Sequence, residues 1–382
     1  MKSFPKVLAI AGSVATAAVF AAPANATTPS TAHRSGFTHG VVFVQNDDPA
    51  GNTVITYDRM ASGGLRQAGS YPTGGRGGVL SGSVVDHLAS QGSLGYDRSS
   101  RSLYAVNAGS NTLTAYGVSG DRLVRRQVVP TGGDFPVSVA THGNLVFVLN
   151  ARDGGSVSGY LRVGSHLLPI PAWHRALHLN TSAPGQSDEF TSTPGQIGFT
   201  PDGRNLIVST KNGGNTLKTF PVGLFGPSLR PVTTNLPGAV PFGFAFDRSG
   251  HLVLSEAGTN SVATFAVSRR GTISPIDSAA TGQAATCWIA TAGDAVFASN
   301  AGSGNLSRYT TARSGGLTGR GLTATDAGTV DATTSSDGQY LYVQTGATGT
   351  VDAFRIQPHG SLIRTGSVVV PNAVGAEGIV AL

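Results

Sequence analysis

Residues 103–116 read LYAVNAGSNTLTAY: a short apolar strand, an asparagine, a glycine-containing turn and a second strand that ends in an aromatic residue. The same order recurs six more times, as in residues 252–265 (LVLSEAGTNSVATF). The closing aromatic residues are Tyr57, Tyr116, Tyr160, Phe220, Phe265, Tyr309 and Phe354. Their separations of 59, 44, 60, 45, 44 and 45 residues give a base period near 44 with two insertions of about 15 residues. This period matches one four-stranded propeller blade.

Each unit accounts for four strands, which we call a to d from the inside of the ring outwards. Residues 199–220 (FTPDGRNLIVSTKNGGNTLKTF) contain the a–b turn at Asp202-Gly203, strand b, the b–c turn and strand c. Asp-Gly is a favoured tight turn because both residues tolerate positive φ. The 53 glycines and the 12% of charged residues fit an all-β chain with many turns. The sequence therefore predicts an all-β, seven-bladed β-propeller of four-stranded blades.

The two ends of the repeat predict how the ring closes. The first unit begins at a strand b over residues 40–46, and residues 376–382 (AEGIVAL) look like a strand a with no strand b after them. Pairing these two segments would complete the first blade and remove two open sheet edges. The propeller is therefore predicted to span residues 39–382, with its ring closed by the C-terminal strand.

The first residues of the chain predict export. Two lysines precede an apolar, alanine-rich run over residues 7–22, and residues 24–26 read ANA. A basic start, an apolar run of this length and a small-residue exit are the features of a secretory signal peptide. Residues 1–26 are thus predicted to be a signal peptide cleaved near Ala26/Thr27, and residues 27–38 a disordered lead-in. The protein is expected to be secreted and extracellular, with no membrane span, and to be a monomer.

Charge and cysteine content exclude several classes of function. Removal of residues 1–26 leaves 24 basic and 20 acidic residues, a formal charge of +4. The basic residues are scattered and do not alternate with aromatic ones, so no nucleic-acid partner is expected. Cys287 is the only cysteine, which excludes an intrachain disulfide. With one thiol and no tight histidine cluster, we expect no metal site and no cofactor. The sequence also lacks the G-x-S-x-G, H-E-x-x-H, Walker and C-x-x-C motifs.

Function is expected on the face where the d–a and b–c loops meet. Both insertions fall in d–a loops, over residues 72–91 and 169–193, and the polar b–c turns belong to the same face. Loops on a rigid scaffold often carry binding residues, although insertions can also be neutral. The expected partner is a small-molecule or glycan ligand. The candidate ligand-binding residues are Asn107, Gln196, Lys211 and Asn300. The alternative for asparagines at strand ends is bonding within their own turns.

Five residues are candidates for catalysis: His87, Arg175, Glu256, Asp331 and Glu377. Glu256 is the one carboxylate among the aligned strand-b ends, which otherwise carry Asn or Thr. Asp331 and Glu377 come from adjacent blades, where two carboxylates could bind a cation or separate their pKa values for acid–base chemistry. A carboxylate or His87 would activate water, and Arg175 would stabilise the oxyanion. The alternatives are solvated acids, turn caps and a surface histidine.

The wording of the repeat resembles the seven-bladed lactonase family. The N-x-x-x-N-T spacing of residues 107–112 and the T-P-D-G turn of residues 200–203 carry the resemblance, which extends over residues 40–382. That family contains bacterial 6-phosphogluconolactonases and fungal carboxymuconate-lactonizing enzymes. The resemblance implies the propeller fold and, for an enzyme, carboxylic ester hydrolysis or cycloisomerisation. It also implies His, Arg and Glu at the starts of inner strands. Here those starts read Pro136-Val137-Ser138, Pro194-Gly195-Gln196 and Pro241-Phe242-Gly243, so no catalytic residue carries over.

Two functions remain open on the sequence. The first is a secreted lactonase-like enzyme that hydrolyses or isomerises a lactone or sugar-derived compound at the mouth of the channel. The alternative is a non-catalytic extracellular propeller that binds a ligand, a glycan or a protein. An exported protein would not meet 6-phosphogluconolactone, which is a cytosolic phosphorylated sugar.

Overall fold

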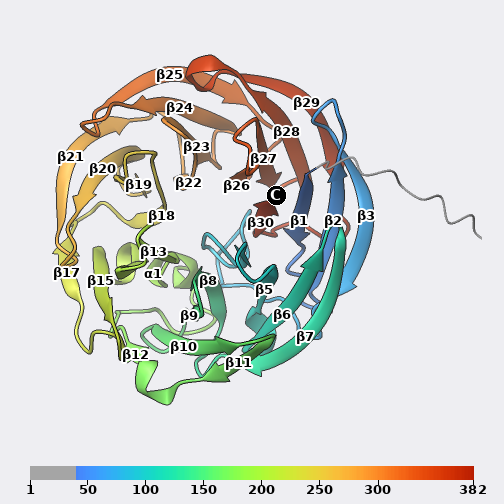
Figure 1. Cartoon of the computed structure of the whole chain (residues 1–382). Helices are drawn as coiled ribbons and strands as arrows, with labels where there is room; N and C mark the ends of the chain where they lie inside the picture. Colours follow the sequence, from blue (N-terminus) through green and yellow to red (C-terminus); the bar gives the residue numbers. More distant parts are fainter. Residues whose placement is uncertain (1–39) are drawn as a thin grey trace, which may run out of the picture. The chain divides into compact units, whose positions relative to one another are not determined.

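A computed structural model describes residues 40–382, which form seven sheets arranged as the blades of one propeller (Figure 1). The predicted signal peptide and lead-in lie outside the described residues. The blades, each written from the inner to the outer strand, are β30 (Ile379–Ala381), β1 (Val41–Gln45), β2 (Thr53–Arg59) and β3 (Leu65–Pro72); β4 (Leu94–Asp97), β5 (Ser102–Asn107), β6 (Thr112–Ser119) and β7 (Arg122–Pro130); β8 (Pro136–His142), β9 (Leu145–Asn150), β10 (Ser156–Val163) and β11 (His166–Pro169); β13 (Gln196–Phe199), β14 (Asn205–Ser209), β15 (Thr216–Gly223) and the pair β16 (Gly226–Pro227) and β17 (Val232–Asn235); β18 (Pro241–Phe246), β19 (Leu252–Glu256), β20 (Ser261–Val267) and β21 (Ile273–Ala280); β22 (Thr286–Ala292), β23 (Ala295–Asn300), β24 (Asn305–Thr311) and β25 (Leu317–Ala324); and β26 (Thr329–Thr334), β27 (Tyr340–Thr345), β28 (Thr350–Ile356) and β29 (Leu362–Val369).

The short elements lie between strands. They are η1 (Ala108–Ser110), η2 (Pro171–Trp173), β12 (Arg175–Ala176), which pairs with β10, α1 (Glu189–Ser192), α2 (Lys211–Gly214) and η3 (Pro358–Gly360). Among the described residues, no helix is long and apolar enough to span a membrane. One feature was not predicted: the outer strand of the fourth blade is split into β16 and β17.

The ring closes as the sequence predicts. Strand β30 pairs antiparallel with β1, so that Ile379 lies opposite Val44 and Ala381 opposite Val42. The backbone N–H of Gln45 also donates to Gly378 O at 2.9 Å. Without β30, β1 would be the inner edge strand of the first blade, with unpaired backbone groups. The C-terminal strand therefore supplies the inner strand that the first blade lacks.

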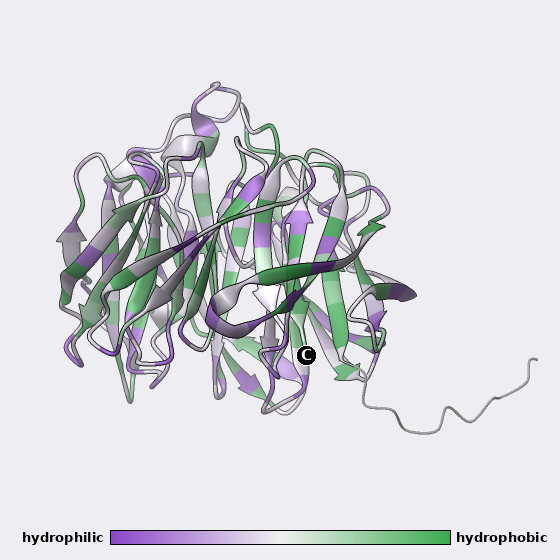
Figure 2. Cartoon of the chain, turned by 90° about the horizontal axis from the view of Figure 1, so that it is seen from above, coloured by the Kyte–Doolittle hydropathy of each residue, from purple (hydrophilic) through white to green (hydrophobic). Residues whose placement is uncertain are grey.

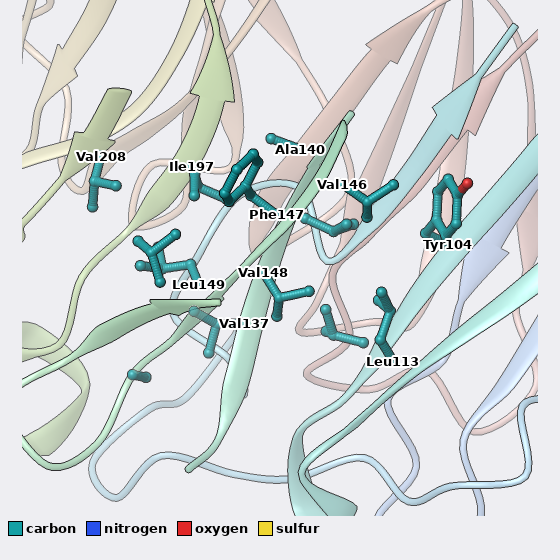
Figure 3. Close-up of a cluster of buried hydrophobic side chains, with 14 of the residues drawn as sticks. Tyr104, Leu113, Val137, Ala140, Val146, Phe147, Val148, Leu149, Ile197 and Val208 are labelled. Atoms are coloured by element: carbon teal, nitrogen blue, oxygen red, sulfur yellow. The ribbon is translucent and has the colours of Figure 1, made fainter. Parts of the chain in front are cut away.

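Burial explains why strands b read as continuous apolar runs. All but the first residue of β9 is buried, because neighbouring blades cover both faces of the strand. Outer strands such as β21 are mostly exposed and carry polar residues. Figure 2 shows the apolar residues along the strands of the blades. Figure 3 shows one cluster between blades, where Tyr104, Phe147 and Ile197 come from three successive sheets.

In three of the blades, the second asparagine of the repeat ties the blade to the next one. It has positive φ at the end of the b–c turn, a conformation that asparagine tolerates well. Its Oδ1 accepts the backbone N–H at the start of the following inner strand. The three pairs are Asn111 with Phe135 at 2.9 Å, Asn215 with Val240 at 3.0 Å, and Asn260 with Thr286 at 3.1 Å. The repeated Asn-Thr or Asn-Ser is therefore a structural signature of the fold.

Candidate functional site

The first insertion, residues 73–92 between β3 and β4, lies inside the ring, and we call it the channel plug (Figure 1). The indole N–H of Trp288 donates to Ser90 O at 2.6 Å. The side chain of Gln91 donates to Ile289 O at 2.7 Å and accepts from Ile289 N at 3.0 Å. These contacts join residues 198 positions apart, so the plug extends from the second blade to the sixth. It is a packed part of the propeller and not a surface decoration.

The plug also bonds to the first and fourth blades and to the C-terminal segment. The backbone N–H of His87 donates to Gly375 O at 2.7 Å, and that of Gln91 donates to Gly195 O at 3.0 Å. Leu80 and Leu88 are fully buried. A segment of irregular backbone can lie this deep only because its polar groups find partners on the inner strands. The plug therefore places its own side chains at the centre of the ring.

Four buried carboxyl groups, one of them on the plug itself, lie close enough to affect one another electrostatically. Asp47, Asp86, Asp331 and Glu377 are each at most 3% exposed, and we call them the acid cluster. Asp86 accepts the backbone N–H groups of Leu88 and Ser90, both at 2.9 Å, and so shapes the turn of the plug. Asp47 accepts the backbone N–H of Glu377 at 3.0 Å.

Glu377 joins the plug to the C-terminal segment. Its Oε1 accepts the hydroxyl of Ser90 at 2.6 Å and the backbone N–H of Ser93 at 3.2 Å. Its other oxygen, Oε2, is buried and has no hydrogen-bond partner among residues 40–382. Asp331 lies close enough for its charge to raise the pKa of Glu377.

Desolvation makes the carboxyl groups of the acid cluster weaker acids than ordinary carboxyl groups. Burial raises the pKa of Asp47 and Asp331 to about 7 and that of Asp86 to about 8. The pKa of Glu377 is raised well above its usual value by burial and then by repulsion from the other three carboxyls. The cluster consequently retains protons at neutral pH, where ordinary carboxyl groups have lost them.

Lys211 is the basic residue of this centre, and it is 1% exposed. Its Nζ donates to Ala89 O of the plug at 2.6 Å and to Phe190 O of the second insertion at 2.5 Å. Burial lowers the pKa of Lys211 to about 7, although the nearby Asp86 opposes this shift. A neutral amine has two N–H bonds and one lone pair. The two carbonyls satisfy both donors and leave the lone pair free to accept a proton.

A pocket of about 390 Å³ opens beside Lys211 on the loop face. Phe190 comes from the second insertion, Phe242 from β18 and Cys287 from β22, so three blades contribute walls. Lys211 Nζ lies 5.1 Å from the centre of the Phe242 ring, in contact with its face. Burial raises the pKa of the Cys287 thiol to about 12, which leaves it protonated and unreactive at neutral pH.

The second insertion locks the plug in place. Glu189 of α1 is fully buried; its Oε1 accepts Arg152 Nε at 2.7 Å and its Oε2 accepts the backbone N–H of Ser81 at 2.9 Å. Burial raises the pKa of Glu189, but the bonds from Arg152 and Ser81 outweigh it and hold the pKa below its usual value. We call this arrangement the plug latch.

Glu189→Ala is expected to destabilise the protein by about 3 kcal/mol, because it leaves the Arg152 guanidinium and the Ser81 amide without their acceptor. Chemical denaturation measures the loss, and hydrogen exchange at Ser81 should speed up. Asp188→Ala is the matched control, since that neighbouring carboxylate is exposed and caps nothing. Equal stability of the two variants would contradict the latch.

The structure separates the five residues predicted for catalysis. Asp331 and Glu377 meet in the acid cluster. His87 lies on the plug, half-buried against Gly375, and burial lowers its pKa. Arg175 lies in β12 on the outer side of the third blade and donates to four backbone carbonyls, including Ser228 O at 2.8 Å and Ala172 O at 2.7 Å. The carboxylate of Glu256 accepts the Ser261 hydroxyl at 2.7 Å across its own turn.

The residues predicted for ligand binding also lie in different places. Asn107 donates to the Thr114 hydroxyl at 2.9 Å, and Asn300 donates to the Ser307 hydroxyl at 2.9 Å, so each ties strand b to strand c. Gln196 bonds the backbone of Phe244 in the next blade at 2.6 and 3.0 Å. Lys211 is the member of the set that lines the pocket. Within residues 40–382, no group of three or more His, Cys, Asp or Glu side chains could hold a metal ion.

Sequence reasoning did not identify Asp47, Phe242 or Ser90 as parts of the centre. Asp47 has positive φ just after β1, and its carboxyl turns inward to the backbone of Glu377. The only sequence signal was an Asp in an Asn-Asp-Asp turn, which is also what an ordinary surface turn would contain. Cys287 lies partly exposed in the pocket wall.

Comparison with solved structures places this geometry among known propellers. A proposed 6-phosphogluconolactonase of Bacteroides uniformis superposes with a TM-score of 0.70 at 18% identity, over 90% of this chain and 99% of the other. The periplasmic gluconolactonase of Pseudomonas aeruginosa gives a TM-score of 0.69 at 17% identity, with the same coverage. The fold is that of the seven-bladed lactonase propellers. A streptogramin B lyase is more distant, with a TM-score of 0.53 at 15% identity over 76% of this chain and 86% of the lyase. No family model and no curated protein sequence matches the chain.

Proposed function

We propose that this lactonase-like propeller, after export, hydrolyses a lactone in the pocket beside Lys211. One observation supports this proposal above the others. The buried Lys211 donates hydrogen bonds to Ala89 O and Phe190 O, and its side chain lines a pocket of about 390 Å³. A base with a pKa near 7 is well matched to proton transfer at neutral pH. The lactonase-type fold is consistent with this chemistry.

In the proposed reaction, neutral Lys211 removes a proton from a water molecule as the water oxygen attacks the lactone carbonyl carbon. The carbonyl oxygen takes up the negative charge in a tetrahedral intermediate. The intermediate then collapses, the bond between the carbonyl carbon and the ring oxygen breaks, and the Lys211 ammonium returns the proton to that oxygen. The products are one hydroxy acid and the regenerated amine. Burial lowers the pKa of Lys211 by more than the neighbouring Asp86 raises it, so the amine can give up its proton near neutral pH.

Lys211→Met is expected to lower kcat/KM for a hydrolysed lactone at least about 100-fold, which is the usual contribution of a general base. Hydrolysis is followed by pH-stat titration over a panel of δ-lactones. The control is Lys218→Met, since Lys218 is the other lysine within residues 40–382 and lies outside the pocket. In the wild type, kcat/KM should rise with pH through about 7 as Lys211 loses its proton.

Two results would overturn the proposal. Turnover by Lys211→Met at the rate of Lys218→Met would exclude the lysine as the base. The absence of turnover by the wild type on every lactone of the panel would exclude hydrolysis and leave a binding propeller.

A further inference from the structure

The walls of the pocket beside Lys211 are mostly apolar. Phe190, Val240 and Phe242 line it together with Ala257 and the protonated Cys287. Phe242 is held in place by Trp288, with the two ring centres 5.0 Å apart and the rings edge to face. Val240 and Ala257 belong to the loop and turn that flank the fifth blade. Such a surface gains free energy by removing hydrocarbon from water and offers few partners to hydroxyl groups.

The pocket lacks the groups that recognise phosphate or other strong anions. Lys211 is its one basic lining residue, and both of its donors are committed to backbone carbonyls. Arginine, which binds phosphate through a bidentate fork, does not line the pocket. An anionic or heavily hydroxylated ligand would lose more hydration here than Thr191 and Asn212, the polar lining residues besides Lys211, could replace with new bonds.

We propose that this pocket takes an uncharged lactone that carries an alkyl or aromatic substituent, and that it discriminates against polyhydroxylated and phosphorylated sugar lactones. This inference rests on the proposed function only for the lactone ring itself. The preference for an apolar substituent rests on the walls formed by Phe190, Val240 and Phe242. The lactone carbonyl would face Lys211, and the substituent would lie against Phe242.

Two δ-lactones of the same ring size provide the test. The six-membered ring of δ-decalactone carries a pentyl chain, whereas that of δ-gluconolactone carries hydroxyl groups. Binding is followed by the fluorescence of Trp288, which contacts Phe242, in a Trp173→Phe background that leaves Trp288 as the one tryptophan. We expect δ-decalactone to bind at least about 10-fold more tightly, which corresponds to about 1.4 kcal/mol.

Filling the pocket supplies a second, independent arm. Ala257→Phe places a ring in the pocket and should weaken δ-decalactone binding at least about 10-fold. Ala347→Phe is the matched control, because Ala347 lies in the b–c turn of the seventh blade as Ala257 lies in that of the fifth, but it is exposed and does not line the pocket. That variant should bind like the parent, and thermal denaturation of both checks that they fold.

The outcomes separate this inference from the proposed function. Tight binding of δ-decalactone that Ala257→Phe abolishes supports the inference even if no lactone is hydrolysed. Equal or tighter binding of δ-gluconolactone or its 6-phosphate overturns it, even if that sugar lactone is hydrolysed in a Lys211-dependent way. Unchanged δ-decalactone binding by Ala257→Phe would also overturn it, because the ligand would then lie elsewhere.

Discussion

Removal of residues 373–382 is expected to abolish cooperative folding. The deletion takes away β30 and leaves the backbone groups of β1 unpaired at the inner edge of the first blade. It also removes Ile379 and Ala381, which are buried, and the Glu377 carboxyl that holds Ser90 and Ser93. An open apolar edge next to Phe43 would recruit other chains. We expect no thermal transition in calorimetry and a loss of the parent's peak in size-exclusion chromatography.

A rearranged chain is the matched control for that deletion. Residues 373–382 are moved in front of Gly40 with a short glycine linker, so that β30 and β1 form a covalent hairpin. The linker has little distance to span, because Leu382 N donates to Val41 O at 2.8 Å. This variant should keep a Tm within a few degrees of the parent. A deletion variant that unfolds cooperatively near the parent Tm would show that β30 is dispensable.

The free energy of unfolding is expected to fall as pH rises from 5 to 7. Asp47, Asp86, Asp331 and Glu377 have folded-state pKa values above those of the unfolded chain. The folded protein therefore binds more protons than the unfolded chain in this range. The stability that these protons provide is complete below about pH 4 and is lost as pH rises through 7 to 8. One such group gives a slope of about 1.4 kcal/mol per pH unit, and several should exceed it.

His87 and Lys211 oppose this fall in stability with rising pH, each over part of the pH range. The lowered pKa of His87 adds stability as pH rises toward 6.5, but it is one group against four. The folded-state pKa of Lys211 is about 7 and lies below its unfolded value, so its contribution increases with pH only above about 7. The net slope between pH 5 and 7 is therefore set by the acid cluster. Urea denaturation at a series of pH values measures it.

Glu377→Gln should flatten this dependence and make the protein more stable than the wild type at pH 8, by about 1–2 kcal/mol. Glutamine keeps an acceptor for Ser90 and Ser93 and can donate from its amide to Asp331, without adding charge. Glu256→Gln removes a carboxyl outside the cluster and should leave the slope unchanged. A wild-type stability that is constant or increases from pH 5 to 7 would contradict the proton-retaining cluster.

The pairing of Asp331 with Glu377 could be anticipated because the repeat fixes the register of every blade. Once seven units are aligned, residues at the start of neighbouring inner strands must be neighbours in space, and ring closure brings Glu377 beside the seventh blade. What alignment could not supply was the environment. The same two carboxyls could have been solvated surface acids, and it is the plug above them that removes water and raises their pKa values.

Arg175, Glu256, Asn107 and Asn300 show what a position in the sequence leaves open. Each occupies a loop or strand end where a functional side chain would be plausible, yet each bonds to its own turn, to the neighbouring strand or to nearby backbone. A residue type at a loop position does not specify the direction of its side chain. That direction depends on which partner lies within hydrogen-bonding distance, and the sequence does not contain those distances.

The sequence by itself determined the seven blades, their four-stranded pattern and the closure of the ring, because these follow from local turn chemistry and from a period that repeats along the chain. It also located the two insertions. Only the tertiary structure decided that residues 73–92 fold into the ring, that Glu189 latches them, and that Lys211 and Phe242 share a pocket. Insertions have no repeat to constrain them, so their path is set by long-range contacts with several blades at once.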